Sequence, residues 1–519
     1  MSNTHEGGDT RQKHPATHKK QKQKGIFIIM KKFFSVLLSI LMLTASLSMM
    51  AMPASAAEAI TADSTWYDDT KTTLVISDAA DLLAFAAQIN AKNTFVGKTV
   101  ELSADIDLNP GWVASTTAPT NVWDITGCGV NGFWGTFDGK GHTISGIYLS
   151  LDSYQRGIFG NFQCNDRQKD ADGNIIIITP VVKNLAVVNS VVPVRGNDMG
   201  GFYGYLAKGQ GDGKGNWDCI TFENVYNAID LITTTAASNN TAGTAENVGG
   251  FIGKCNTSGI AFKFTNCVYA GKMVMNTLIH DKVGGFIGST GTTKKDDVHN
   301  TYTNCAYYGN ANIGADFFGC FVADGIRADI LKNCVSAGIM SSTADAMDFI
   351  AGGLVHQKNS STTITDCLYT TTNGVNTPLG EEVSVAPEGT TFCTHAELIG
   401  ANAKTPAEGW TKTAGYAMPT ELYNQFKTLL DAQTPVVPEG ESQPGDEATD
   451  TDDNSTTEAG ETAENTEKSD NQTEAGKTTE GAGTTEPADD KGCGGVIGLG
   501  AVAIVGVAAV AVAFKKKED

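Results

Sequence analysis

The chain lacks the clustered positive charge of a nucleic-acid-binding protein. Only five of its 37 basic residues are arginine, and apart from a short run at 19–24 no group of lysines forms a basic face for a phosphate backbone. The formal net charge of -21 lies mostly in 438–490, a segment that contains 17 acidic residues and only two lysines. The rest of the chain is nearly neutral, so we expect no nucleic acid as a partner.

The short motifs of common enzymes and metal sites are missing as well. The sequence contains no HExxH, no GxSxG and no CxxC, and its eight histidines are scattered. We therefore expect neither a cofactor nor a resident metal. Calcium bound by Asp212, Asp218 or the pair Asp296 and Asp297 stays open as an alternative, although these acids lack the alternating ligands of an EF-hand loop.

Residues 30–56 have the three parts of a secretory signal peptide. Two lysines precede an apolar run that ends in Ala54, Ser55 and Ala56, so we expect export and cleavage after Ala56. An uncleaved membrane helix is the alternative, because the apolar run is long for a signal peptide. Residues 1–29 are a basic, polar extension in which we predict no domain.

The C-terminal end predicts a membrane anchor. Residues 494–514 form an uncharged apolar segment that is long enough to cross a membrane as a helix. Three lysines open the tail 515–519, and the positive-inside bias keeps this tail in the cytoplasm and the bulk of the chain outside the cell. The end is similar to the cell-wall sorting signals of Gram-positive bacteria but has no LPxTG, so we expect a single-pass membrane protein at the cell surface.

An acidic stalk is expected between the anchor and the globular part. Residues 434–492 are rich in threonine and glutamate and contain no aromatic residue. Such a segment cannot bury enough surface to fold, and its like charges repel one another. We predict a disordered, extended linker.

A repeated GGFxG-like element is the most informative feature of the chain. Its copies begin 49, 35, 35 and 33 residues apart, within short segments rich in β-branched and aromatic residues. They lie at 200–204, 249–253, 284–288, 319–323 and 352–356, and the clearest paired glycines are Gly200, Gly201, Gly249, Gly250, Gly284 and Gly285. Short strands at this period predict a stack of coils, each of which buries its apolar face on the next.

A second repeated element follows each of these copies. Its first four copies contain an asparagine, the fifth has Asp366 in that place, and in the last four copies a cysteine follows directly. The asparagines are Asn224, Asn266, Asn304 and Asn333, and the cysteines are Cys267, Cys305, Cys334 and Cys367. Asparagine tolerates a left-handed turn, so stacked coils would form a ladder of amide hydrogen bonds. The cysteines recur at one repeat position and not in pairs, which favours small buried side chains over disulfides.

The region before the repeats is expected to cap the first coil. Ser77 can begin a helix over 78–90, within a cap of 57–98, and the helix would cover an open sheet edge. Its apolar face consists of Leu82, Phe85, Ala86 and Ile89. We predict the coils over 99–420, with the clearest repeats at about 200–370, and a short helix over 421–433.

Three stretches carry a resemblance to a known family. They are SADIDL at 103–108, GTFDGKGHTI at 135–144 and the GGFxG elements, and they resemble bacterial surface proteins with GLUG-motif repeats. The resemblance covers about 74–420 and implies a right-handed parallel β-helix that acts as a display scaffold. The motif also occurs beside the catalytic domain of IgA-peptidase-like metalloproteases, but this chain has no HExxH.

Three functions stay open: an adhesin that binds a glycan or host protein, a polysaccharide-active enzyme, and a passive surface spacer. Catalytic carboxylates could be Asp105 and Asp107, which share one strand face, or Asp138 near His142. Aspartates in such strand-to-turn motifs more often cap turns, so we predict that the protein is not an enzyme.

A binding site would be expected on a long loop of the rigid scaffold. The 49-residue interval contains 209–218, a Gly- and Asp-rich loop with Asp212, Trp217 and Asp218, and a second loop lies at 292–300. We predict that most tyrosines near the repeat elements are core residues, because aromatic side chains dominate buried packing.

Overall fold

The computed structural model describes residues 58–433, apart from 126–131, 151–154, 164–168, 234–245, 257–258, 291–298, 326–328, 343–349, 358–361 and 371–387. The chain divides into two units, 1–448 and 449–519, and all described residues belong to the first. The extension, signal peptide, acidic linker, apolar segment and tail predicted above lie outside the described residues. Within the described part, no helix is both long and apolar enough to cross a membrane.

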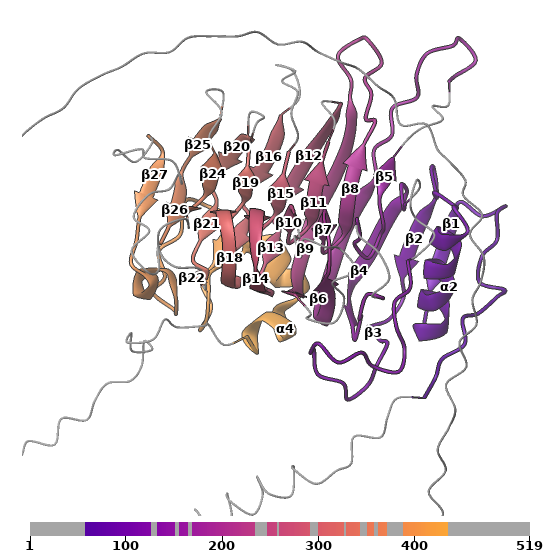
Figure 1. Cartoon of the computed structure of the whole chain (residues 1–519), viewed down its shortest axis with the longest axis horizontal. Helices are drawn as coiled ribbons and strands as arrows, with labels where there is room; N and C mark the ends of the chain where they lie inside the picture. The colour runs from indigo at the N-terminus through magenta and orange to yellow at the C-terminus, as the bar shows by residue number, and fades with distance from the viewer. Residues whose placement is uncertain are drawn as a thin grey trace, which may run out of the picture. The chain divides into compact units, whose positions relative to one another are not determined.

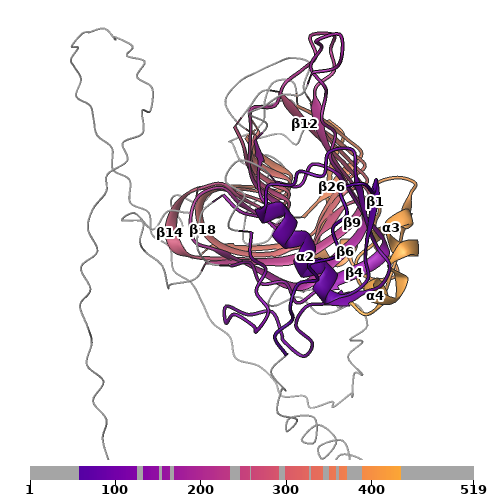
Figure 2. The same cartoon turned by 90° about the vertical axis from the view of Figure 1, so that its right-hand side faces the viewer.

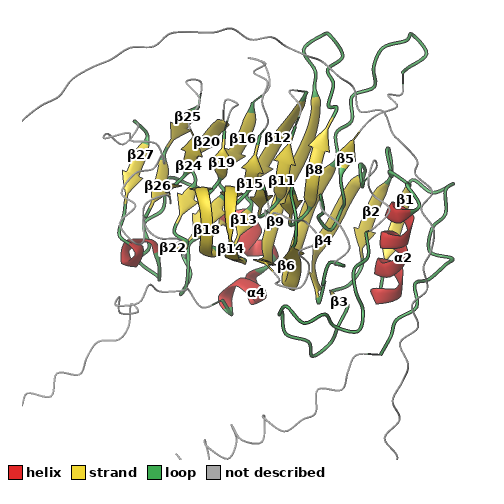
Figure 3. Ribbon diagram, viewed as in Figure 1, coloured by secondary structure: helices red, strands yellow, loops and turns green. Residues whose placement is uncertain are grey.

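Strands dominate the described part, and they stack side by side along one direction (Figures 1 and 3). Every pairing between the named strands of the two larger sheets is parallel, for example β9 with β12 and β12 with β16. The largest sheet contains β1 (Thr73–Ile76), β2 (Thr99–Leu102), β3 (Ile106–Asp107), β4 (Thr136–Ser145), β6 (Val181–Val194), β7 (Met199–Gly200), β9 (Asp218–Thr233), β10 (Val248–Gly249), β12 (Ile260–Thr265), β13 (Val268–Tyr269), β14 (Lys272–Gly284), β16 (Asn300–Thr303), β17 (Ala306–Tyr307), β18 (Asn310–Gly319), β20 (Asp329–Lys332), β21 (Val335–Ser336), β22 (Ile339–Ser342), β23 (Ile350–Gly352), β25 (Thr363–Thr365), β26 (Cys367–Tyr369) and β27 (Thr390–Phe392). This mostly β architecture is the arrangement expected of a parallel β-solenoid.

The remaining elements are few and short. The second sheet runs in the order β24 (Val355–Gln357), β19 (Val322–Asp324), β15 (Ile287–Ser289), β11 (Ile252–Cys255), β8 (Tyr203–Ala207) and β5 (Phe162–Gln163). A small antiparallel pair consists of β28 (Trp410–Thr411) and β29 (Met418–Pro419). The helices are α2 (Ala79–Asn90), the 3₁₀-helix η2 (His395–Leu398), α3 (Thr420–Gln425) and α4 (Lys427–Asp431).

Rows of identical positions fill the interior of the coils. Phe222, Phe264 and Tyr302 occupy one register position on β9, β12 and β16, and none of them is exposed. Their rings stack nearly parallel, with centroids 5.0 Å and 5.1 Å apart. The phenylalanines of the GGFxG elements form a second row, in which Phe251 and Phe286 stack at 4.8 Å. The repeat in the sequence is thus a row of buried side chains in the fold.

The GGFxG element turns the chain sharply between two strands. In the second copy, β10 ends at Gly249 and β11 begins at Ile252. A Cβ at Gly249 would lie 1.9 Å from the carbonyl oxygen of Ile252, so only glycine lets the two strands approach this closely. The sequence feature that marked the repeat is therefore a steric requirement of the corner.

The helix predicted near residue 78 is present as α2, although its N-cap differs. Asp78, not Ser77, caps the helix, since its Oδ1 accepts hydrogen bonds from the backbone N–H of Ala80 and Asp81 at 2.9 Å and 3.0 Å. Ser77 instead donates its hydroxyl to Asp81. The predicted apolar face is buried, and α2 lies beside β1 in Figure 1.

The C-terminal part lies across the outside of the coils, which the sequence did not predict. The single helix expected over 421–433 is two short helices, α3 and α4, because the backbone leaves the helical conformation at Phe426. Figure 2 shows both helices outside the face that contains β6 and β9. Tyr416 stacks on Tyr308 with ring centroids 4.2 Å apart, and Leu422 is fully buried against the same outward-facing apolar row.

Candidate functional site

The loop predicted as the binding site, 209–218, forms a hairpin in which two of the three singled-out side chains face the protein. Asp218 is fully buried, and its two carboxylate oxygens accept hydrogen bonds from the N–H of Ile178 at 3.0 Å and of Gln210 at 2.9 Å. Trp217 is half-buried, and its ring covers Gly211, where a Cβ would lie 2.7 Å from the indole. Asp218 is therefore occupied within the fold, and its position does not favour the calcium role.

Asp212 closes the tip of this hairpin. Its Oδ1 accepts from the backbone N–H of Lys214 at 2.7 Å and of Asn216 at 3.1 Å, and its Oδ2 accepts from the Asn216 side chain at 2.6 Å. These hydrogen bonds, the Asn216 side-chain bond foremost, hold the pKa of Asp212 below its usual value. The tip residues 213–216 are exposed. The Asp212 carboxylate thus fixes the conformation of the loop and stays ionised.

A second hairpin of the same design lies next to the first, on the preceding coil. Asp170 accepts from the N–H of Asp172 and Asn174 and from the Asn174 side chain, at 2.8 Å to 3.0 Å. Lys214 of the first hairpin reaches Asn174 of the second, with Nζ 3.5 Å from Oδ1. Both tips share the pattern Asp-x-x-Gly-Asn, at 170–174 and 212–216, with a left-handed glycine at its fourth position. This pattern was a signal for the second hairpin that sequence reasoning missed.

The carboxylates considered for catalysis accept hydrogen bonds that hold turns or neighbouring coils in place. Asp105 accepts from the N–H of Thr143 at 2.8 Å and lies 3.3 Å from Nδ1 of His142, while Asp107 accepts from the N–H of Asn109 at 3.0 Å. Asp138 is buried and accepts from the N–H of Lys140 and the side chain of Asn184. Asp105 and His142 do lie together, at an exposed turn. Their contacts join neighbouring coils, whereas Asp107 and Asp138 each accept from a backbone N–H two residues later, as turn caps do.

The repeated asparagines and cysteines make hydrogen bonds that stabilise the stacked coils. Asn224, Asn266, Asn304 and Asn333 all have φ between 53° and 58°, and each donates its side-chain N–H to the residue one coil earlier at 2.5–3.2 Å. Their ladder begins at Asn184, which donates to Asp138. The cysteines are buried free thiols, and each donates to the carbonyl two residues before it; they are Cys267, Cys305, Cys334 and Cys367.

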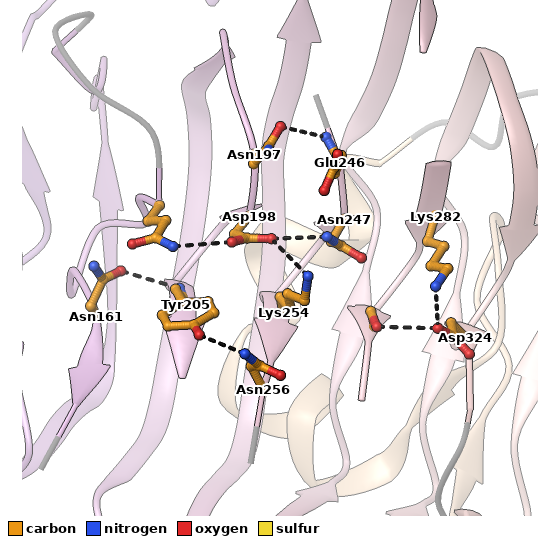
Figure 4. A network of polar contacts seen from close by, with 12 residues as sticks. Asn161, Asn197, Asp198, Tyr205, Glu246, Asn247, Lys254, Asn256, Lys282 and Asp324 are labelled. Carbon is orange, nitrogen blue, oxygen red and sulfur yellow. Dashed lines mark hydrogen bonds and ion pairs between the residues drawn. The ribbon is translucent and has the colours of Figure 1, made fainter. Parts of the chain in front are cut away.

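A further cluster of charged and amide groups lies where the coils turn at the GGFxG elements, and we call it the polar corner (Figure 4). One row precedes the glycines and the other follows them, so the two rows meet across the turn. The register of neighbouring strands aligns the preceding row as Asp198, Asn247 and Lys282, and the following row as Tyr205, Lys254, Ser289 and Asp324. The corner thus brings together residues 126 positions apart.

Asp198 is the centre of one half of the polar corner. It is only 5% exposed, and its Oδ1 accepts from the side chain of Asn247 at 2.9 Å and lies 3.9 Å from Nζ of Lys254. Gln155 donates to the other oxygen at 3.2 Å. Burial raises the pKa of Asp198 above its ordinary value, and the attraction of Lys254 and the two amides offsets only part of that rise.

Asp324 is the centre of the other half. It is 2% exposed and forms an ion pair with Lys282, with Nζ 2.5 Å from Oδ2, and the Ser289 hydroxyl donates to the same oxygen at 3.3 Å. Its second oxygen, Oδ1, is buried without a hydrogen-bond partner. In the part of the chain that the structure describes, no group of three or more His, Cys, Asp or Glu residues could hold a metal ion, and 291–298 with Asp296 and Asp297 lies outside that part.

Comparison with known proteins gives little beyond this geometry. A scan against protein-family models gives no match, and a search of curated proteins gives none. Among solved structures, the chain is similar to a provisionally assigned immunoglobulin A1 protease of Bacteroides ovatus, with 20% identity, a TM-score of 0.38, and coverage of 63% of this chain and 84% of that chain. A likeness at this level assigns neither a family nor an activity.

Proposed function

We propose that the protein is a surface-displayed β-solenoid of a Gram-positive bacterium that binds an extracellular glycan or host protein through its two neighbouring hairpins, 169–175 and 211–217. This proposal rests on one observation: both hairpin tips are exposed, and the same set of Asp and Asn hydrogen bonds fixes each of them on adjacent coils. The GLUG-type repeat, a right-handed coil and a capping role for α2 belong to this proposal. Crossovers between parallel strands are right-handed in nearly all proteins, which supports the handedness.

Rigidity is what makes the hairpins suitable for binding. A loop that already holds its bound conformation loses little entropy when a ligand docks, so exposed polar groups on it contribute more affinity. Asp172 and Lys214 present opposite charges at the two tips, and both are exposed. Loops on a rigid scaffold are also where binding residues concentrate. The hairpins therefore combine exposure with a fixed shape.

Export and anchoring complete the proposal. The signal peptide at 30–56 and the apolar segment at 494–514, with the acidic linker before it, would hold the solenoid outside the cell. Asp107 and Asp138 cap local turns, and Asp105 holds the backbone of Thr143 on the neighbouring coil, which supports a protein that binds without catalysis. We infer no cofactor.

A binding array of glycans and host proteins, probed with the full exported chain, tests this proposal. We expect binding that Lys214→Glu and Asp172→Ala weaken by at least about tenfold, equivalent to about 1.4 kcal/mol. The matched control is Asp63→Ala, which removes an aspartate of a similar exposed turn at another place on the chain. Binding that all variants retain would place the site elsewhere, whereas no binding would favour a passive spacer and sugar cleavage would favour an enzyme.

A further inference from the structure

Three groups that can react with one another meet at Asp198 in the polar corner. Lys254 supplies an amine, Asn247 a carboxamide and Asp198 a carboxyl group, and Figure 4 shows the first two side chains pointing at the third. Both nitrogens approach the same carboxylate oxygen, at 3.9 Å for Nζ of Lys254 and 2.9 Å for Nδ2 of Asn247. The amine and the amide are therefore neighbours across the turn, although they lie seven positions apart in the sequence.

The surroundings of the three groups exclude most water. Asn247 is 3% exposed and Asp198 is 5% exposed, while the Lys254 side chain retains 26% of its exposure. In such an environment a buried carboxyl group exchanges protons readily with a neighbouring amine, because the separated charges are poorly solvated. Burial also raises the pKa of Asp198, which favours its protonated form as a proton donor.

We propose that Lys254 and Asn247 become joined by an isopeptide bond after folding, with Asp198 as the catalytic acid–base residue. The lysine ammonium gives a proton to Asp198, and the neutral amine attacks Cγ of Asn247. The Nζ–Cγ bond forms, Asp198 passes the proton to the amide nitrogen, and the Cγ–Nδ2 bond breaks. The lysine nitrogen loses its second proton to the departing ammonia, so that one ammonium ion leaves and Asp198 returns to its starting state.

The same corner contains a pair that lacks one of the three groups. Lys282 lies closer to its carboxylate than Lys254 does, but the side chains that reach Asp324 are Lys282 and Ser289, and neither carries an amide. No carboxamide shares a carboxylate oxygen with Lys282 in the way that Asn247 does with Lys254. Gln155 does contact Asp198, but at Oδ2, while Lys254 and Asn247 share Oδ1. These contacts select Asn247 as the acceptor and make Lys282 a matched control.

Peptide mapping of the full purified chain tests the bond directly. Trypsin normally cleaves after Lys254, whereas a lysine acylated by Asn247 resists it, so we expect a single peptide 215–263 that is lighter by the mass of one ammonia molecule. Fragmentation should place the link between positions 247 and 254. A peptide that ends at Lys254 with its full mass would overturn the proposal.

Two other outcomes would also overturn it. Loss of ammonia with normal cleavage after Lys254 would mean a succinimide at Asn247, and a link to Gln155 would mean a different acceptor. Lys254→Arg should restore cleavage at position 254, and Asp198→Asn should slow formation of the bond by at least about 100-fold. Lys282→Arg should leave the 215–263 peptide unchanged. Because the wild-type map is decisive alone, the test holds even if a variant fails to fold.

Discussion

The asparagine ladder combines backbone geometry and side-chain hydrogen bonding in one residue. Asn304 has φ +53°, donates to Oδ1 of Asn266 at 3.1 Å and accepts from the side chain of Asn333 at 2.5 Å. Left-handed backbone is unfavourable for residues other than glycine and asparagine by about 1–2 kcal/mol. Each ladder position therefore needs a residue that tolerates the turn and also carries both a donor and an acceptor.

Substitution of Asn304 should separate these two contributions. We expect Asn304→Ala to lower the free energy of unfolding by about 2–4 kcal/mol, because it adds backbone strain and removes two partly buried hydrogen bonds. Asn304→Gly should lower it by about 1–2 kcal/mol less, since glycine relieves the strain alone. Urea unfolding of the two variants and the wild type measures the difference. Equal losses would show that the backbone conformation contributes nothing.

Residues of this kind were predictable because their role is local and repeated. An asparagine after a strand predicts a left-handed turn, and its four recurrences predict a ladder once the coils stack. The contacts of Asp218 with the N–H groups of Ile178 and Gln210 were not predictable in the same way. They depend on the neighbouring coil, which sequence spacing does not place, so Asp218 resembled a loop residue available for a ligand.

At the scale of elements, the C-terminal segment covers an apolar row that parallel coils would otherwise expose. The row consists of outward-facing residues of successive coils, including Tyr226, Tyr308 and Leu368, and α3 and α4 pack on it together with Tyr416. Asn266 of the ladder also donates to Glu421 of α3 at 3.3 Å. The segment therefore contacts several coils at once and ties them together.

Truncation of Leu422 should show how much the C-terminal segment contributes to stability. It is fully buried, so we expect Leu422→Ala to lower the free energy of unfolding by about 2–5 kcal/mol. The control Lys427→Ala removes an exposed charge of the adjoining helix and should change it by less than about 0.5 kcal/mol. Denaturant unfolding measures both, and binding of a hydrophobic dye should increase for Leu422→Ala alone. Similar small effects for the two variants would mean that the segment adds little stability.

Elements differ in how far the sequence predicts them. The face of α2 and the glycine corners follow from residue patterns, because helix period and backbone sterics act over a few residues. The lateral position of α3 and α4 and the pairing of the two hairpins arise only when distant coils stack. The polar corner is of the second kind, since Lys282 and Asp324 lie 42 residues apart along the chain and become partners only where the two rows meet across the turn.

At the scale of the whole molecule, the thiol and phenol groups buried along the stack are kept neutral. Burial raises the pKa of the Cys320 thiol to about 12, and it raises the pKa values of Tyr203, Tyr269 and Tyr302 as well. Each of these groups is therefore neutral in the folded protein over a pH range in which the unfolded chain ionises. Thiols ionise first, because their ordinary pKa lies near 9.

This difference makes the fold sensitive to alkali. A thiol whose pKa is raised by folding contributes its full stabilisation below its unfolded pKa, and this contribution is lost as pH rises from about 9 towards 12. Between pH 9 and pH 10.5 we expect the free energy of unfolding to fall by up to about 1.4 kcal/mol per pH unit for Cys320. Urea unfolding of wild type and Cys320→Ala across this range isolates the thiol, because the other buried groups titrate in both proteins. The variant should show the shallower decline, and parallel pH profiles would mean that Cys320 ionises equally well in the folded and unfolded chain.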